Sequence, residues 1–135
     1  MTKPPSPAES GNSRLRLVLA DSRLAKLGDA YVNFVFSLGR SRALREPQGI
    51  KVSDRILAEA LRRSGLRQEL PRRTTRQDCA NAVEALLVFG YLNKLVTLEE
   101  AVDRIAASPD SPVDAFVSLI RSVAEKIEDG KSNSA

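Results

Sequence analysis

Apolar residues recur every three or four positions in each segment from about residue 13 to residue 128, and no segment shows the alternation of a half-buried strand. This pattern predicts an all-α protein with six or seven helices in a single domain. The domain should span residues 14–127, with helices at about 13–20, 23–43, 53–63, 76–94, 97–107 and 112–128. Residues 1–13 and 128–135 are polar and lack periodicity, so we expect disordered tails there.

Three of the expected helix starts carry capping signals. Ser53 precedes an amphipathic segment, Thr75 is followed three residues later by Asp78, and Thr97-Leu-Glu-Glu100 has the form of a capping box. The stretch Glu46-Pro-Gln-Gly49 predicts a turn between two helices.

The segment from Leu24 to Leu38 is the one around which the rest of the chain is organised. Its apolar residues form two stripes on opposite sides, so we expect this helix to be covered nearly all round. A glycine inside a helix costs about 1 kcal/mol relative to alanine, so Gly28 predicts that another backbone passes close by. Asp29 is a carboxylate among apolar neighbours, which is unfavourable unless it is hydrogen-bonded, neutralised or bound to a metal. The stripes are Leu24, Leu27, Tyr31, Phe34, Val35 and Leu38, and Ala25, Val32 and Phe36.

A second carboxylate, Glu84, lies in a later helix and is also surrounded by apolar residues. Asn81 precedes it by three residues on the same helix face, and Asp78 lies three residues before Asn81. Two buried carboxylates on separate helices are what an oxygen-ligand Mg²⁺ or Mn²⁺ site requires, and such an ion supports phosphodiester hydrolysis. The alternative is that each acid is neutralised by Lys26, by an arginine or by a backbone group.

The composition of the chain limits the kinds of catalytic and metal site that it can form. The 135-residue chain has no histidine and a single cysteine, Cys79, so it forms no internal disulfide and lacks the commonest metal ligand and acid–base group. Most zinc sites and the Ser-His and Cys-His triads are thereby excluded. No apolar run reaches the roughly 20 residues of a membrane span, and the polar N-terminus does not resemble a signal peptide. We therefore expect a cytoplasmic protein without a membrane partner.

Charge is distributed unevenly along the chain. Residues 40–76 hold eleven basic and four acidic residues, whereas residues 77–135 hold five basic and ten acidic ones. A basic middle indicates a surface that binds a polyanion, although scattered solvated arginines would give the same count. The candidate residues for binding this polyanion, RNA if the resemblance described next holds, are Arg40, Arg42, Arg45, Lys51, Arg55, Arg62, Arg63, Arg72, Arg73 and Arg76.

Three motifs resemble the endonuclease domain of the ribonuclease III family. Leu24-Ala-Lys-Leu-Gly-Asp-Ala30 is similar to its signature helix, Val52-Ser-Asp-Arg-Ile-Leu-Ala58 to its next motif, and Asn81-Ala-Val-Glu-Ala-Leu-Leu87 to its second acidic motif. The short chain is similar to the compact archaeal branch, which lacks a separate double-stranded-RNA-binding domain. The resemblance implies an all-helical homodimer that cleaves double-stranded RNA with Mg²⁺ or Mn²⁺ and no small-molecule cofactor.

The resemblance also implies a set of metal ligands, of which Asp29 and Glu84 match the family acids. The first signature glutamate falls on Ala25, which cannot ligate, and the first acid of the second motif falls on Asn81, whose amide oxygen can. One further family acid falls on Ser22, beside Asp21. Asp78, Asp54 and Asp21 are possible auxiliary ligands.

The signature helix forms the family's dimer interface, and one small bundle cannot bury all of its apolar residues. We therefore expect a symmetric homodimer with Tyr31, Phe34, Val35 and Phe36 at the interface. The predicted function is metal-dependent hydrolysis of phosphodiester bonds in double-stranded or structured RNA, in RNA processing, with Asp29 and Glu84 as catalytic residues. One alternative is a catalytically impaired homodimer that serves as an RNA-binding or assembly module. Another is a helical interaction protein without a nucleic-acid role.

Overall fold

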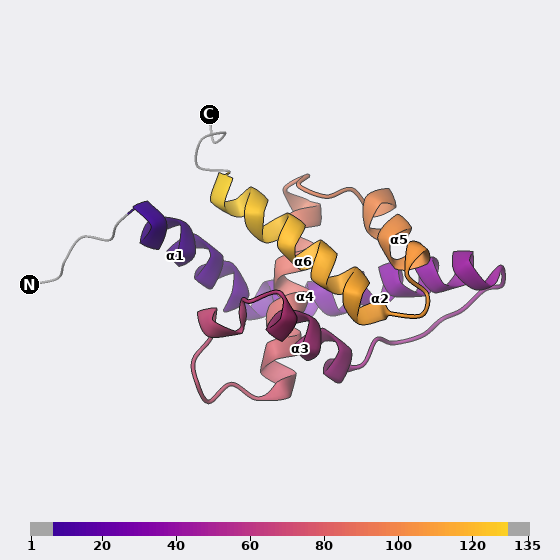
Figure 1. Cartoon of the computed structure of the whole chain (residues 1–135), viewed down its shortest axis with the longest axis horizontal. Helices are drawn as coiled ribbons and strands as arrows, with labels where there is room; N and C mark the ends of the chain where they lie inside the picture. The colour runs from indigo at the N-terminus through magenta and orange to yellow at the C-terminus, as the bar shows by residue number, and fades with distance from the viewer. Residues whose placement is uncertain (1–6, 130–135) are drawn as a thin grey trace, which may run out of the picture.

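The computed structural model describes residues 7–129 as an all-helical bundle, which confirms the predicted fold class (Figure 1). None of the helices in this range is long and apolar enough to cross a membrane. The elements are α1 (Pro7–Leu19), α2 (Ser22–Leu44), α3 (Asp54–Arg63), the 3₁₀ turn η1 (Arg67–Glu69), α4 (Arg76–Leu92), α5 (Leu98–Ala107) and α6 (Pro112–Asp129).

Helix boundaries follow the capping residues. Ser53 accepts a hydrogen bond from the N–H of Ile56, Thr75 accepts one from Asp78, and Thr97 forms a reciprocal capping box with Glu100. The two ends of the chain differ from expectation, because α1 begins at Pro7, inside the predicted first tail, and α6 ends at Asp129. The remaining tail residues, 1–6 and 130–135, lie outside the described part of the chain.

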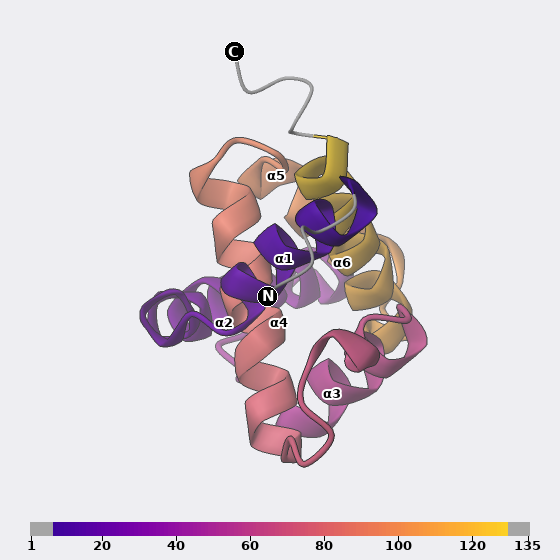
Figure 2. The same cartoon turned by 90° about the vertical axis from the view of Figure 1, so that its left-hand side faces the viewer.

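Helix α4 is the centre of the bundle. Figures 1 and 2 show it crossing α2, with α3 near its first turn and α5 near its last. Ten of its 17 residues are buried, including Val83, Glu84 and Leu86. The backbones of α4 and α2 can come into contact only where the residue between them has a very small side chain. Gly28 provides that place, because a Cβ atom there would lie 2.0 Å from the carbonyl oxygen of Glu84. The close backbone approach predicted from this glycine is confirmed.

Helix α2 turns residues of both apolar stripes to the core. Gly28, Val32, Val35, Phe36 and Gly39 are buried, because the two glycines let α4 and α5 pack closely along this line. Val35 and Phe36 are only 2% and 6% exposed, so their assignment to a dimer interface is wrong: the bundle itself buries them.

Part of the first apolar stripe of α2 is not covered by the bundle. Leu27 and Phe34 remain 50% and 53% exposed, so the expectation of a helix covered nearly all round is also wrong for the single chain. Tyr31, on the same stripe, packs against Tyr91 of α4 with ring centroids 5.2 Å apart. An apolar patch of Leu27, Tyr31, Phe34 and Tyr91 therefore faces outward.

The segment between α2 and α3 is attached to α2 by side chains spaced one helical turn apart. The Ser37 hydroxyl donates to the carbonyl oxygen of Ile50 (2.8 Å) and accepts from its N–H (2.9 Å). The Ser41 hydroxyl accepts from the N–H of Gln48 (2.7 Å) and donates to its carbonyl oxygen (3.3 Å). Residues 46–52, which we call the docked segment, are thereby held along α2 and lead directly into the first turn of α3.

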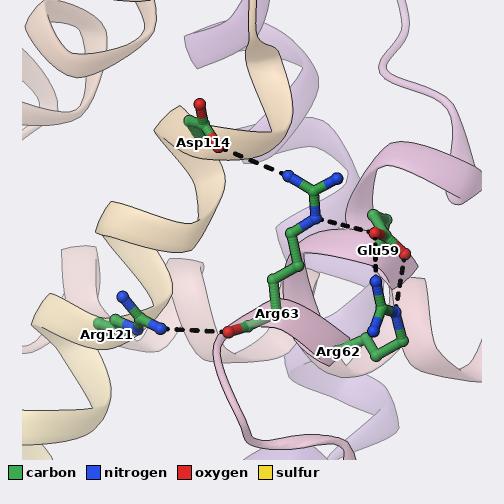
Figure 3. Close-up of polar contacts among 5 residues, drawn as sticks. All are labelled: Glu59, Arg62, Arg63, Asp114 and Arg121. Atoms are coloured by element: carbon green, nitrogen blue, oxygen red, sulfur yellow. Dashed lines mark hydrogen bonds and ion pairs between the residues drawn. The ribbon is translucent and has the colours of Figure 1, made fainter.

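The far end of α3 is joined to α6 by an ion-pair network (Figure 3). Glu59 accepts from Arg62 (2.6 Å) and Arg63 (2.8 Å), which lower the pKa of its carboxyl to about 2. Arg63 also lies 3.7 Å from Asp114, and Arg121 donates to the Arg63 carbonyl oxygen (3.1 Å). This network fixes α3 against α6.

We expect Gly28→Ala to lower the free energy of unfolding by about 3 kcal/mol, measured by urea denaturation. The added methyl group would meet the Glu84 backbone, which cannot rotate away. Gly49→Ala is the control, because a Cβ there has nothing within 4 Å, and it should change stability by less than about 0.5 kcal/mol. Equal stability of the two variants would contradict the close α2–α4 crossing.

Candidate functional site

A cleft of about 590 Å³ opens where α2 crosses the first half of α4. Its walls come from five places: the end of α1, α2, the end of the docked segment with the first turn of α3, the segment after η1, and α4. Every acid singled out in the sequence lines this one cleft, together with Asn81 and two lysines. These polar lining residues include Asp21, Lys26, Asp29, Lys51, Asp54, Asp78, Asn81 and Glu84.

Glu84 and Asp29 meet inside the cleft, because the α2–α4 crossing at Gly28 places them side by side. Glu84 is 6% exposed and is the one buried charged residue among those whose burial the structure describes. Burial raises the pKa of its carboxyl to about 8, and the negative charge of Asp29 and a hydrogen bond to it add to this shift. At neutral pH Glu84 therefore mostly carries a proton, which it shares with Asp29.

The auxiliary acids contribute less directly. Asp54 raises the pKa of Glu84 through its charge, whereas Lys51 lowers it. Asp21 is the N-cap of α2, where its side chain accepts hydrogen bonds from the N–H groups of Arg23 (2.9 Å) and Leu24 (3.0 Å). Asp78 lies in the first turn of α4 and is exposed. Asp21 therefore has a structural role, and Asp54 and Asp78 remain at the rim.

One alternative was that Lys26 neutralises Asp29. Lys26 lines the same cleft, but the ion pairs formed within residues 13–128 do not include it. The polar partner that does contact Asp29 is Asn33, one turn further along α2. Its side-chain amide donates to the Asp29 carboxylate (3.1 Å) and to the Asp29 carbonyl oxygen (2.8 Å).

Sequence reasoning missed Asn33. Its amide oxygen also accepts a hydrogen bond from the N–H of Val52, at 2.8 Å, so it joins Asp29 to the docked segment. The signal was the spacing of Asn33, Ser37 and Ser41, three polar residues four positions apart on one face of a mostly apolar helix. This row indicates a polar partner lying along the helix.

The cleft holds oxygen donors of the kind that a hard divalent cation prefers. Two adjacent carboxylates, Asp29 and the buried Glu84, line it together with the amide of Asn81. Ala25 lines the cleft too and offers no ligand. Within the described residues no group of three or more Asp, Glu, His or Cys side chains could hold a metal ion.

The predicted RNA-binding residues divide into two groups. Lys51 lines the cleft, and Arg55, Arg72, Arg73 and Arg76 are exposed and adjoin lining residues in the chain. The others lie away from the cleft, four of them engaged within the bundle. Arg40 donates to the Pro109 carbonyl oxygen, Arg42 pairs with Glu99 and Asp103, Arg62 and Arg63 belong to the α3–α6 network, and Arg45 caps α2 in a left-handed conformation.

The family model described as Ribonuclease III matches residues 22–128, which include Asp29, Asn33 and Glu84. No curated protein matches the chain.

The raised pKa of Glu84 makes stability depend on pH. The unfolded carboxyl loses its proton near its ordinary pKa of 4.5, whereas the folded one keeps it up to about 8. The folded state therefore binds the extra proton in this window, and the free energy of unfolding falls as pH rises through it. From pH 6 to pH 8 this amounts to about 2 kcal/mol.

Glu84→Gln removes this loss, so its stability relative to wild type should rise by about 2 kcal/mol between pH 6 and pH 8, measured by urea denaturation. Glu59→Gln is the control. Glu59 has a folded pKa of about 2 and is ionised in both states throughout this range, so its effect should be equal at both pH values. A Glu84→Gln difference that does not change with pH would show that Glu84 is ionised in the fold.

Proposed function

Because the chain belongs to the ribonuclease III family, we propose that it is a metal-dependent endoribonuclease that hydrolyses phosphodiester bonds in double-stranded or structured RNA. The observation that carries the proposal is the buried Glu84 held against Asp29 in an open cleft. A carboxylate pair raised in energy by mutual repulsion and burial is unfavourable for stability and is typical of a functional site.

Asp29 and Glu84, assisted by the Asn81 amide, would hold Mg²⁺ or Mn²⁺. When bound, the ion would lower the pKa of water and neutralise phosphate charge. The chain has no histidine that could act as a base instead. Glu84 would hold the ion in its ionised form, with its proton released to water. Lys26 and Lys51 line the same cleft and attract the phosphate backbone toward the acids.

The rim of the cleft would hold the RNA. Lys51 lines the cleft, and the exposed residues Arg55, Arg72, Arg73 and Arg76 adjoin lining residues in the chain, so they are the candidates for contacts with the RNA backbone. Such groups contact phosphates and give little sequence specificity. Binding should therefore weaken steeply with salt.

A second function is favoured by Ala25. Ala25 lines the cleft and offers no ligand, and no group of three or more Asp, Glu, His or Cys side chains among the described residues could hold a metal ion. A protein with this cleft would bind RNA through the basic rim without cleaving it, as a binding or assembly module.

A homodimer completes the proposal. The outward patch of Leu27, Tyr31, Phe34 and Tyr91 runs along α2 and onto α4 without a covering element in the bundle. The Tyr31 hydroxyl is already half-buried, which raises its pKa to about 12. A second copy packed around a two-fold axis would cover the same patch on both chains. Val35 and Phe36 stay in the core.

We expect wild-type protein with Mn²⁺ to cleave duplex RNA, and Glu84→Gln to lose about 100-fold or more of this activity, because loss even of an outer partner of a metal ligand costs 10–100-fold. Glu125→Gln, an exposed acid on α6, is the control and should cleave as wild type does. Products are resolved on denaturing gels.

Equal cleavage by wild type and Glu84→Gln, or none by either, would contradict the endonuclease proposal. Salt-dependent duplex binding by both proteins without cleavage would instead select the binding module.

We expect the wild-type chain to sediment as a dimer at micromolar concentration and Phe34→Glu to sediment as a monomer, because a buried unpaired charge opposes association. Leu17→Glu, at a 74% exposed position on α1, should leave the dimer intact. A wild-type monomer in analytical ultracentrifugation would refute the dimer.

A further inference from the structure

Asp29 lies on α2 and is contacted by two side chains, one from α4 and one from α2 itself. Glu84 reaches it from α4, and Asn33 contacts it from the next turn of its own helix. The Asn33 amide group is fully used: its nitrogen donates to Asp29 and its oxygen accepts from the Val52 N–H. Asn33 is therefore the one described side chain that bonds both to a cleft acid and to the docked segment.

These bonds give Asn33 a directional role. A helical Asp side chain can rotate about its Cα–Cβ bond, and a donor at 3.1 Å from one oxygen selects the rotamer that faces Glu84. The amide of Asn33 cannot rotate in turn, because Val52 is 3% exposed and its N–H holds the amide oxygen. The buried backbone of the docked segment thus fixes the orientation of the acid.

The same bond also sets the position of the cationic wall. Val52 follows Lys51, which lines the cleft and whose positive charge lowers the pKa of Glu84. Asp54, on the same wall, begins α3 two residues later. Asn33 therefore holds Asp29 and the wall that carries Lys51 in a fixed position relative to each other.

We propose that Asn33 is a positioning residue, which orients Asp29 for cation binding and ties the lysine-bearing wall of the cleft to it. The inference rests on the proposed function for its role in cation binding, but the orientation of Asp29 can be tested without any metal.

Ser37 supplies a matched control. It holds the docked segment by two hydrogen bonds to Ile50, one turn further along α2, and does not touch Asp29. Ser37→Ala therefore loosens the docked segment alone, whereas Asn33→Ala loosens it and also frees Asp29. Asn33→Ser, which admits water to the Val52 N–H, replaces Asn33→Ala if that variant does not fold.

Two readouts apply to the full-length protein. In metal-free protein, the Asp29 side-chain carboxyl ¹³C resonance should shift in Asn33→Ala and stay in place in Ser37→Ala. In calorimetric titration with Mn²⁺, affinity should fall about 10-fold or more in Asn33→Ala and by less than about twofold in Ser37→Ala.

An unmoved Asp29 resonance in Asn33→Ala, or equal effects of the two variants, would overturn the positioning role. A wild-type protein that does not bind Mn²⁺ would overturn the metal-dependent function instead, while the Asp29 resonance still decides the role of Asn33.

Discussion

The crossing of α2 and α4 at Gly28 is the constraint on which the rest of the molecule depends. Two helices whose backbones touch can do so at one point only, and the chain uses that point to place Asp29 beside Glu84. The residues around the crossing are largely apolar and buried, so the acids meet in a region of low polarity that opens into a cleft. The scaffold and the candidate site share the same contact, and neither can shift without the other.

The pair of acids that forms the candidate site also lowers the stability of the fold. Ionising a buried carboxyl next to another one is unfavourable, which is why the pKa of Glu84 lies near 8. The surrounding core, which includes Val83, Leu86 and Phe116, provides the stability that tolerates it. Sites that are unfavourable for folding but kept in a well-packed protein are commonly those that bind or react. The family match over residues 22–128 agrees with that interpretation.

Local signals were sufficient to predict most of the fold. Helical periodicity and the caps at Ser53, Thr75 and Thr97 fixed where helices begin, and Gly28 revealed the crossing, because each is a property of neighbouring residues. The burial of Val35 and Phe36 was not predictable, since α2 is apolar on two sides and only its partners decide which side is inner. The importance of Asn33 depends on a segment 19 residues away that carries no apolar pattern.

The docked segment has a consequence for how this wall of the cleft can change. Its attachment to α2 uses the peptide groups of Gln48, Ile50 and Val52, and the Ile50 side chain packs against the core, whereas the side chains of Gln48 and Lys51 take no part in these hydrogen bonds. Substitutions at Gln48 and Lys51 can therefore change the charge of this wall without breaking its attachment. Proline is the exception, because it has no N–H to give at any of these three positions. The scaffold thus leaves this wall open to evolutionary variation in charge and closes it to one residue type.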